Sequence, residues 1–133
     1  MKRYSGRPRR NGGYVLSGTP FELYIYDTVR KRYPAYEGWE IYEQCSLEDG
    51  SRIDFYVVKR NAQEQLVYGV VIDAKDKAEL EVVDIEQVIY YLTQTTADEA
   101  IIYVANDTLI PQTVQERADE EDVRIVRTQW GRN

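Results

Sequence analysis

The chain has 133 residues, 43% hydrophobic and 30% charged, a composition that predicts one globular domain able to bury a core. It has no histidine and a single cysteine, which excludes histidine-based catalytic triads, histidine-ligated zinc and an internal disulfide framework. No apolar run reaches membrane-spanning length and the first residues do not resemble a signal peptide, so we expect a cytoplasmic protein with no membrane partner.

Charge is distributed unevenly along the chain. The formal net charge is −6, yet five of the 17 basic residues and none of the 23 acidic residues fall in the first ten positions. We interpret residues 1–16 as a basic, flexible arm and residues 17–133 as a single domain. The arm is either a solubilising tail or, through Arg7, Arg9 and Arg10, a phosphate-binding arm. The acidic remainder counts against a large general nucleic-acid surface.

The first predicted element is a helix over residues 21–33. Residues 17–20, Ser-Gly-Thr-Pro, supply a hydroxyl cap and a proline at the first helical position. A spacing of about 100° per residue makes one apolar stripe of Phe21, Ile25, Val29 and Tyr33. Glu22 falls inside this stripe, and an acid on the core side of a helix needs a partner. That partner is an arginine, water at the edge of the stripe, or a functional site.

Three strands are predicted after this helix. Residues 39–45 and 53–58 alternate between apolar and polar positions, and Asp54 is one of the polar ones. Alternation assigns to one face of each strand the side chains of Trp39, Ile41 and Cys45, and those of Ile53, Phe55 and Val57. Residues 67–72 are almost continuously apolar, which is typical of a central strand that is buried on both faces.

The third strand ends in two charged residues. Asp73 and Lys75 flank Ala74, and in a strand they point to the same side. Taken alone, the two are readily explained as an exposed ion pair at the end of a strand, which contributes little to stability. The alternative is a functional site.

The rest of the chain alternates helices and strands. A helix over residues 84–95 has a core face of Ile85, Val88, Ile89 and Leu92, with Gln87 and Tyr91 one turn apart and pointing away from that core. The elements after it are a strand at 100–105, a helix at 111–121 and a short strand at 123–126. The predicted class is α/β, with the order α-β-β-β-α-β followed by an additional helix and an edge strand.

Three acids interrupt the apolar patterns, namely Glu22, Asp54 and Asp73. Adjacent strands bring Asp54 and Asp73 together if the register permits, and converging carboxylates repel one another unless a cation neutralises them. Without histidine or additional cysteines, the expected cation is Mg²⁺, which prefers carboxylate and water ligands. A lysine beside such a metal, here Lys75, stabilises charge on a phosphate or assists the attacking water.

The motif Ile53-Asp54, followed by Asp73-Ala74-Lys75 at the end of the next strand, resembles that of the PD-(D/E)xK nuclease superfamily. The element order is similar to the family's restriction-endonuclease-like core over nearly all of residues 17–127. Glu22 resembles the first-helix acid of its exonuclease and Holliday-junction resolvase branches. Residues 87–91, Gln-Val-Ile-Tyr-Tyr, resemble the Q-x-x-x-Y motif of its RecB-like members.

The resemblance implies metal-dependent phosphodiester hydrolysis of DNA, with Mg²⁺ as cofactor and Mn²⁺ as its substitute. It implies a catalytic group of Asp54, Asp73, Lys75 and Glu22, and metal ligands from Asp54, Asp73, Glu22 and the Ala74 carbonyl. Expected substrate-binding residues are Gln87, Tyr91, Arg52, Arg7, Arg9 and Arg10. A small core with no recognition domain also suggests a homodimer. The chain departs from the family pattern at Ile53, where proline is usual, and at Asp73, where glutamate is more frequent.

Two other functions remain open. One is a non-catalytic relative that binds nucleic acid or a protein, which the net charge of −6 favours. The other is an unrelated small α/β interaction domain whose likeness to the nucleases is coincidental.

Overall fold

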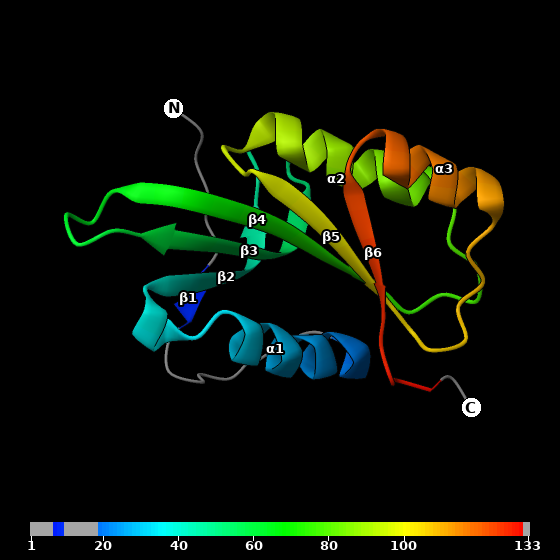
Figure 1. Ribbon diagram of the computed structural model, residues 1–133, viewed down its shortest axis with the longest axis horizontal. Coiled ribbons are helices and arrows are strands. Elements are labelled where there is room, and N and C mark those ends of the chain that lie inside the picture. The colour runs from blue at the N-terminus through cyan, green and yellow to red at the C-terminus, as the bar shows by residue number, and fades with distance from the viewer. Residues whose placement is uncertain (1–6, 10–18, 132–133) are drawn as a thin grey trace.

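One mixed sheet of six strands forms the centre of the molecule, in the order β1-β2-β3-β4-β5-β6. The computed structural model describes residues 7–9, by their backbone alone, and residues 19–131 (Figure 1). The antiparallel strands are β1 (Arg7–Arg9), β2 (Trp39–Ser46), β3 (Arg52–Arg60) and β4 (Leu66–Lys75). The strands added in parallel are β5 (Glu99–Val104) and β6 (Val123–Arg127). The predicted α/β order, with its additional helix and edge strand, is confirmed.

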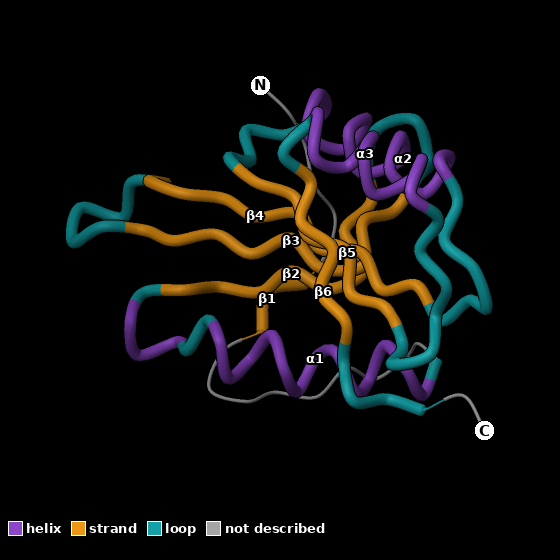
Figure 2. Tube along the Cα trace, turned by 45° about the vertical axis from the view of Figure 1, so that its right-hand side comes forward, coloured by secondary structure: helices purple, strands orange, loops and turns teal. Residues whose placement is uncertain are grey.

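Helices cover both faces of this sheet. They are α1 (Pro20–Arg32), the short 3-10 helix η1 (Ala35–Glu37), α2 (Val82–Gln94) and α3 (Gln112–Glu120). Helices α2 and α3 lie on one face and α1 lies on the other (Figures 1 and 2). Among the described residues, no helix has both the length and the apolar character that crossing a membrane requires.

Two hydrophobic cores result, one on each face of the sheet. Against α2 and α3 pack buried side chains that include Tyr56, Val71, Ile85, Val88 and Ile102. Against α1 pack others that include Phe21, Ile25, Phe55, Val57 and Ile72. Strands β3 and β4 contribute to both cores, as the apolar sequence of residues 70–72 predicts.

Two expectations about the strands are wrong. Val67 is 52% exposed although it was expected in a strand buried on both faces, because the β3–β4 hairpin extends beyond the covering helices (Figure 1). Residues 53 and 55 were expected on one face, as were residues 41 and 45, but Ile53 and Cys45 pack in the α2 and α3 core whereas Phe55 and Ile41 pack in the α1 core. The change of face occurs beside Gln44, which has a left-handed φ of 50° on the neighbouring strand. Such a residue bends the ladder and breaks the two-residue alternation.

The basic arm differs in part from expectation. Arg7–Arg9 form the edge strand β1, in which Arg7 pairs with Glu43 and Arg9 pairs with Ile41 in an antiparallel register. The other residues of the predicted arm, Arg10 among them, lie outside the described residues. This short segment, which composition alone assigned to a flexible arm, is therefore part of the sheet.

Candidate active site

A pocket of about 310 Å³ lies where the end of β4 meets the start of α1, with β3 and α2 on its other sides. Its lining consists of Thr19, Phe21, Glu22, Arg52, Asp54, Asp73, Ala74, Lys75, Asp76, Gln87 and Tyr91. Every site residue that the sequence predicts between positions 19 and 131 is in this lining. Of the three predicted arm arginines, Arg10 and the side chains of Arg7 and Arg9 lie outside the described residues.

Strand register brings the two central acids together. Phe55 on β3 pairs with Ile72 on β4, so Asp54 and Asp73 are the next residues on adjacent antiparallel strands. The Ala74 backbone N–H donates a hydrogen bond of 2.8 Å to Asp54 Oδ2, which ties Asp54 to the strand that carries Asp73. Asp73 is only 3% exposed. Two carboxyl groups are thus held side by side, that of Asp73 buried and that of Asp54 half-buried.

The electrostatics of this pair favour an added cation. Burial raises the pKa of Asp54 to about 9, and the charge and hydrogen bond of Asp73 act in the same direction. The hydrogen bond from the Ala74 N–H lowers the pKa of Asp54, whereas the negative charge of Glu22 raises it further. At neutral pH in the absence of metal, Asp54 therefore holds a proton that a bound cation would displace.

Asp73 keeps a buried oxygen without a hydrogen bond. Its Oδ2 has no hydrogen-bond partner of acceptable geometry, although Lys75 Nζ lies 2.9 Å away. The contact between Lys75 Nζ and Asp73 Oδ2 is therefore an ion pair whose angles do not meet the requirements of a hydrogen bond. The ion pair offsets part of the cost of burying this oxygen, and its unused hydrogen-bonding capacity leaves it free to bind a cation directly.

Lys75 extends from the end of β4 toward α2. Its Nζ donates a hydrogen bond of 2.7 Å to Gln87 Oε1, and Asp84 Oδ1 lies 3.8 Å away. The Lys75 side chain is 20% exposed, so the ammonium stays accessible to a ligand in the pocket. Gln87, which was expected to bind substrate, holds this lysine in the structure.

Glu22 has both of its carboxylate oxygens engaged. Oε1 accepts a bond of 2.9 Å from the Thr19 N–H, completing a capping box at the start of α1, and Oε2 accepts one of 3.0 Å from Gln44 Nε2. Burial raises the pKa of Glu22, but hydrogen bonds from Thr19, Asp54 and Gln44 outweigh it and hold the pKa below its ordinary value. Glu22 is therefore an ionised acid with a structural task at the helix start and a place in the pocket.

Tyr91 lies differently from the prediction. It was expected to point away from the core, yet it is 2% exposed and belongs to the α2 and α3 core. Its hydroxyl group donates a bond of 2.8 Å to the Arg52 carbonyl, so it fixes the start of β3 beside the pocket. Burial, with the charges of Asp73 and Asp54, raises the pKa of Tyr91. Arg52 itself is exposed at the pocket rim.

The donor set suits a hard divalent cation. Asp54 and Asp73 are adjacent, Asp73 is buried and Asp54 half-buried, and Asp73 Oδ2 makes no hydrogen bond and has only the ion pair with Lys75. Among residues 19–131, however, no three acidic or sulfur- or nitrogen-donor side chains are grouped closely enough to make a ready metal site. A two-carboxylate site completed by water matches the preference of Mg²⁺, which keeps several waters when bound to proteins.

Sequence reasoning missed two residues that contact side chains of the pocket, Asp84 beside Lys75 and Gln44 beside Glu22. Asp84 is three residues before Gln87, in the first turn of α2, where an acid is readily explained by helix capping alone. Gln44 is an ordinary polar residue of β2 in the sequence, and its left-handed backbone has no compositional signal. Both were hidden because their contacts join elements that are far apart along the chain.

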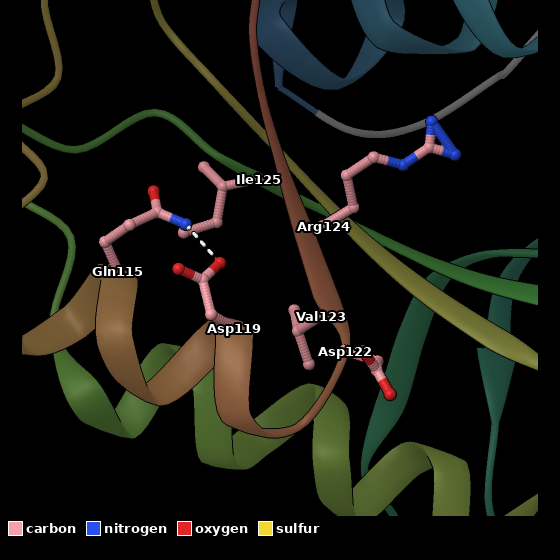
Figure 3. Close-up of a pocket in the computed structure, with 6 residues that line it drawn as sticks. All are labelled: Gln115, Asp119, Asp122, Val123, Arg124 and Ile125. Carbon is pink, nitrogen blue, oxygen red and sulfur yellow. Dashed lines mark hydrogen bonds between the residues drawn. The ribbon is translucent and has the colours of Figure 1, made fainter.

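A second hollow, of about 330 Å³, lies between α3 and β6 (Figure 3). It is lined by Gln115, Asp119, Asp122, Val123, Arg124 and Ile125. Gln115 Nε2 donates a bond of 2.9 Å to Asp119 Oδ1 within α3, and Arg124 pairs with Glu99 at 3.3 Å. These polar groups are satisfied locally, and none of the predicted site residues lies there.

Comparison with known proteins gives one informative likeness. No protein-family model matches the chain, and no curated protein matches it at a significant level. The structure of an EndoMS-dsDNA2 complex is similar, with a TM-score of 0.53 and 16% sequence identity. The match covers 94% of this chain and 51% of the EndoMS chain, so this protein spans about half of that chain's length. With its mixed sheet and element order, the protein has a restriction-endonuclease-like α/β fold.

Proposed function

We propose that the protein is a metal-dependent DNA nuclease that hydrolyses phosphodiester bonds at the pocket beside the end of β4. One observation carries this proposal: residues that the sequence marks separately on α1, β3, β4 and α2 all line a single pocket. The likeness to a protein bound to double-stranded DNA supports DNA as the partner, since it extends over 94% of this chain.

Mg²⁺, or Mn²⁺ in its place, would be held by Asp54 and Asp73, with the Ala74 carbonyl and Glu22 as further oxygen donors. The cation would stabilise negative charge on the phosphate and make a bound water more acidic. The Ala74 N–H orients Asp54, and the strand pairing of β3 with β4 fixes its distance from Asp73. Pre-organisation of this kind lowers the barrier because no side chain has to reorganise during the reaction.

Lys75 and Arg52 are the cations of the pocket lining and are proposed to act on the substrate. Lys75 is close enough to Asp73 to interact with a phosphate or an attacking water beside the metal. Arg52, exposed at the rim, is suited to a neighbouring phosphate of the DNA backbone. The arm arginines Arg7, Arg9 and Arg10 remain proposed phosphate contacts. Gln87 and Tyr91 are proposed to affect substrate binding indirectly, through the residues with which they form hydrogen bonds.

The competing proposal is a non-catalytic module that binds nucleic acid or protein. The net charge of −6 favours it, because DNA-binding surfaces are usually basic. The adjacent Asp54 and Asp73 favour the enzyme, since two acids held together with little access to water destabilise a protein that makes no use of them. A homodimer remains a proposal as well.

Cleavage of DNA with and without metal tests the proposal. Purified protein should cleave linear, branched or single-stranded DNA in Mg²⁺ or Mn²⁺ and not in EDTA. Asp73→Asn should lose both Mg²⁺ affinity, measured by calorimetry, and cleavage by at least about 100-fold, because it removes a charge while keeping the shape. Asp119→Asn, the same change in the α3–β6 hollow, is the matched control and should cleave normally. Absence of metal-dependent cleavage on every substrate would leave the binding module.

A further inference from the structure

Lys75 is held between two carboxylates that belong to different elements. Asp73 Oδ2, on β4, lies 2.9 Å from its Nζ, and Asp84 Oδ1, on α2, lies 3.8 Å from it. Gln87 Oε1, also on α2, accepts its hydrogen bond at 2.7 Å. The ammonium therefore lies between one member of the proposed metal pair and an acid that does not line the pocket.

Asp84 is fixed firmly where it stands. It is 5% exposed, and its Oδ2 accepts bonds of 2.8 Å from both Lys77 Nζ and the Glu81 backbone N–H. These bonds cap the start of α2 and pair the acid with Lys77, so they explain why an acid is present. They use Oδ2, whereas Oδ1 is the oxygen directed to Lys75. A carboxylate anchored by one oxygen offers the other at a constant position.

A bound cation would change which carboxylates are available to pair with Lys75. The proposed Mg²⁺ and the ammonium compete for the same Asp73 carboxylate, and two positive charges that close repel each other. When the metal takes Asp73, the lysine keeps its partners on α2. Without the charge of Asp84, Asp73 itself would be the one carboxylate among residues 19–131 within 4 Å of Nζ.

We infer that Asp84 is a positioning residue for Lys75, and that it holds the ammonium on the α2 side of the pocket while a divalent cation occupies Asp73. This inference rests on the proposed function. It adds that turnover needs one more acid than the sequence predicts, and that this acid is in the first turn of α2. Asp84 acts through Lys75 and touches neither metal nor substrate.

The decisive variant is Asp84→Asn, which keeps an oxygen for the Glu81 N–H and removes the charge. Glu81→Gln is the matched control, because it removes from the same network a carboxylate that pairs with Lys77 at 2.7 Å. Asp84→Asn should weaken Mg²⁺ binding by about 3- to 10-fold in calorimetry and slow single-turnover cleavage by about 10-fold or more, as coupled contacts of this size do. Glu81→Gln should stay within about twofold of the wild type in both measurements.

A double-mutant cycle on Mg²⁺ affinity separates positioning from a general effect of charge. In a Lys75→Met background, Asp84→Asn should leave Mg²⁺ affinity unchanged, because the competing ammonium is gone. Thermal unfolding in EDTA checks that each variant is folded. Asp84→Ser, which also keeps an oxygen at the start of α2, replaces Asp84→Asn in the cycle if that variant does not fold.

Two results would overturn the inference. One is an Asp84→Asn protein that binds Mg²⁺ and cleaves like the wild type; the other is a loss of affinity that persists in the Lys75→Met background. In both cases the wild type still binds metal and cleaves DNA, so the proposed function stands. A wild type that does neither overturns the proposed function, and this inference with it.

Discussion

The pocket beside β4 and the hollow between α3 and β6 have similar volumes, about 310 and 330 Å³, and both are lined by acids. They differ in how those acids are held. Asp119 and Asp122 in the hollow are exposed (Figure 3). In the pocket, Asp73 is 3% exposed and lies beside a half-buried acid, Asp54. Size and acidity do not distinguish a site, but acids brought together out of water do.

The largest expected contrast between the two regions is in their cations. Lys75→Ala should slow DNA cleavage by at least about 100-fold, since it removes charge stabilisation beside the reacting phosphate. Mg²⁺ should still bind, at least as tightly as to the wild type, because the ammonium no longer competes for Asp73. Arg124→Ala removes an exposed cation from the hollow and should change neither quantity. Single-turnover cleavage and calorimetry measure both, and a Lys75→Ala protein that cleaves within about tenfold of the wild type would contradict the assignment.

The central part of the pocket could be predicted from the sequence because it depends on local rules. Alternation places Asp73 and Lys75 on one side of β4, and a tight antiparallel connection puts β3 beside β4, which leaves Asp54 next to Asp73. Glu22 was found because it interrupts an apolar stripe on α1. Each of these inferences needs only the period of one element and the order of its neighbours.

The residues that sequence reasoning missed depend on how elements cross in space. Asp84 acts on Lys75 across the gap between α2 and β4, and no periodicity fixes that distance. Tyr91 was assigned to the outer face of α2 by spacing, but the start of β3 covers it and takes its hydroxyl hydrogen bond. Gln44 adopts a left-handed backbone that residue type alone does not indicate. Tertiary contacts outweighed local pattern in all three.

A second contrast lies in the response to pH. The folded protein raises the pKa of Asp54 from 3.8 to about 9, so it binds this proton more tightly than the unfolded chain does. The resulting stability is fully present below about pH 4 and is lost as the pH rises through about 9. Asp54→Asn removes the titration. In EDTA its free energy of unfolding should exceed that of the wild type by more than about 1 kcal/mol at pH 8, and by less as the pH falls toward 4.

Denaturant unfolding at a series of pH values measures this difference. Asp119→Asn in the hollow is the matched control and should differ from the wild type by a constant amount across the range. Mg²⁺ should reverse the order at pH 8, because it stabilises the wild type by binding the folded state and has lost a ligand in the variant. A difference between Asp54→Asn and wild type that does not change with pH would mean that Asp54 is ionised in the metal-free protein.

The smallest contrast concerns backbone strain, which both regions contain. Gln44 at the pocket and Asp122 at the hollow have φ values of 50° and 55°, a conformation that favours glycine. Asp122→Gly should therefore stabilise the protein by about 0.5–1 kcal/mol. Gln44→Gly gains the same relief but loses the bond of 3.0 Å to Glu22, worth about 1 kcal/mol, so its net effect should be close to zero.

Gln44→Ala separates these two contributions at the pocket. It keeps the strained backbone and loses the bond, so it should be about 1 kcal/mol less stable than Gln44→Gly. Both variants remove the hydrogen bond to Glu22 Oε2 and should lower the rate of cleavage equally. They differ only in the backbone strain at residue 44, which does not change the contacts of Glu22. Unfolding and cleavage measured on the same three proteins test this. If Gln44→Gly is as stabilising as Asp122→Gly, then the Gln44 side chain adds nothing to the fold, and the left-handed residue beside Asp54 serves only to bend β2.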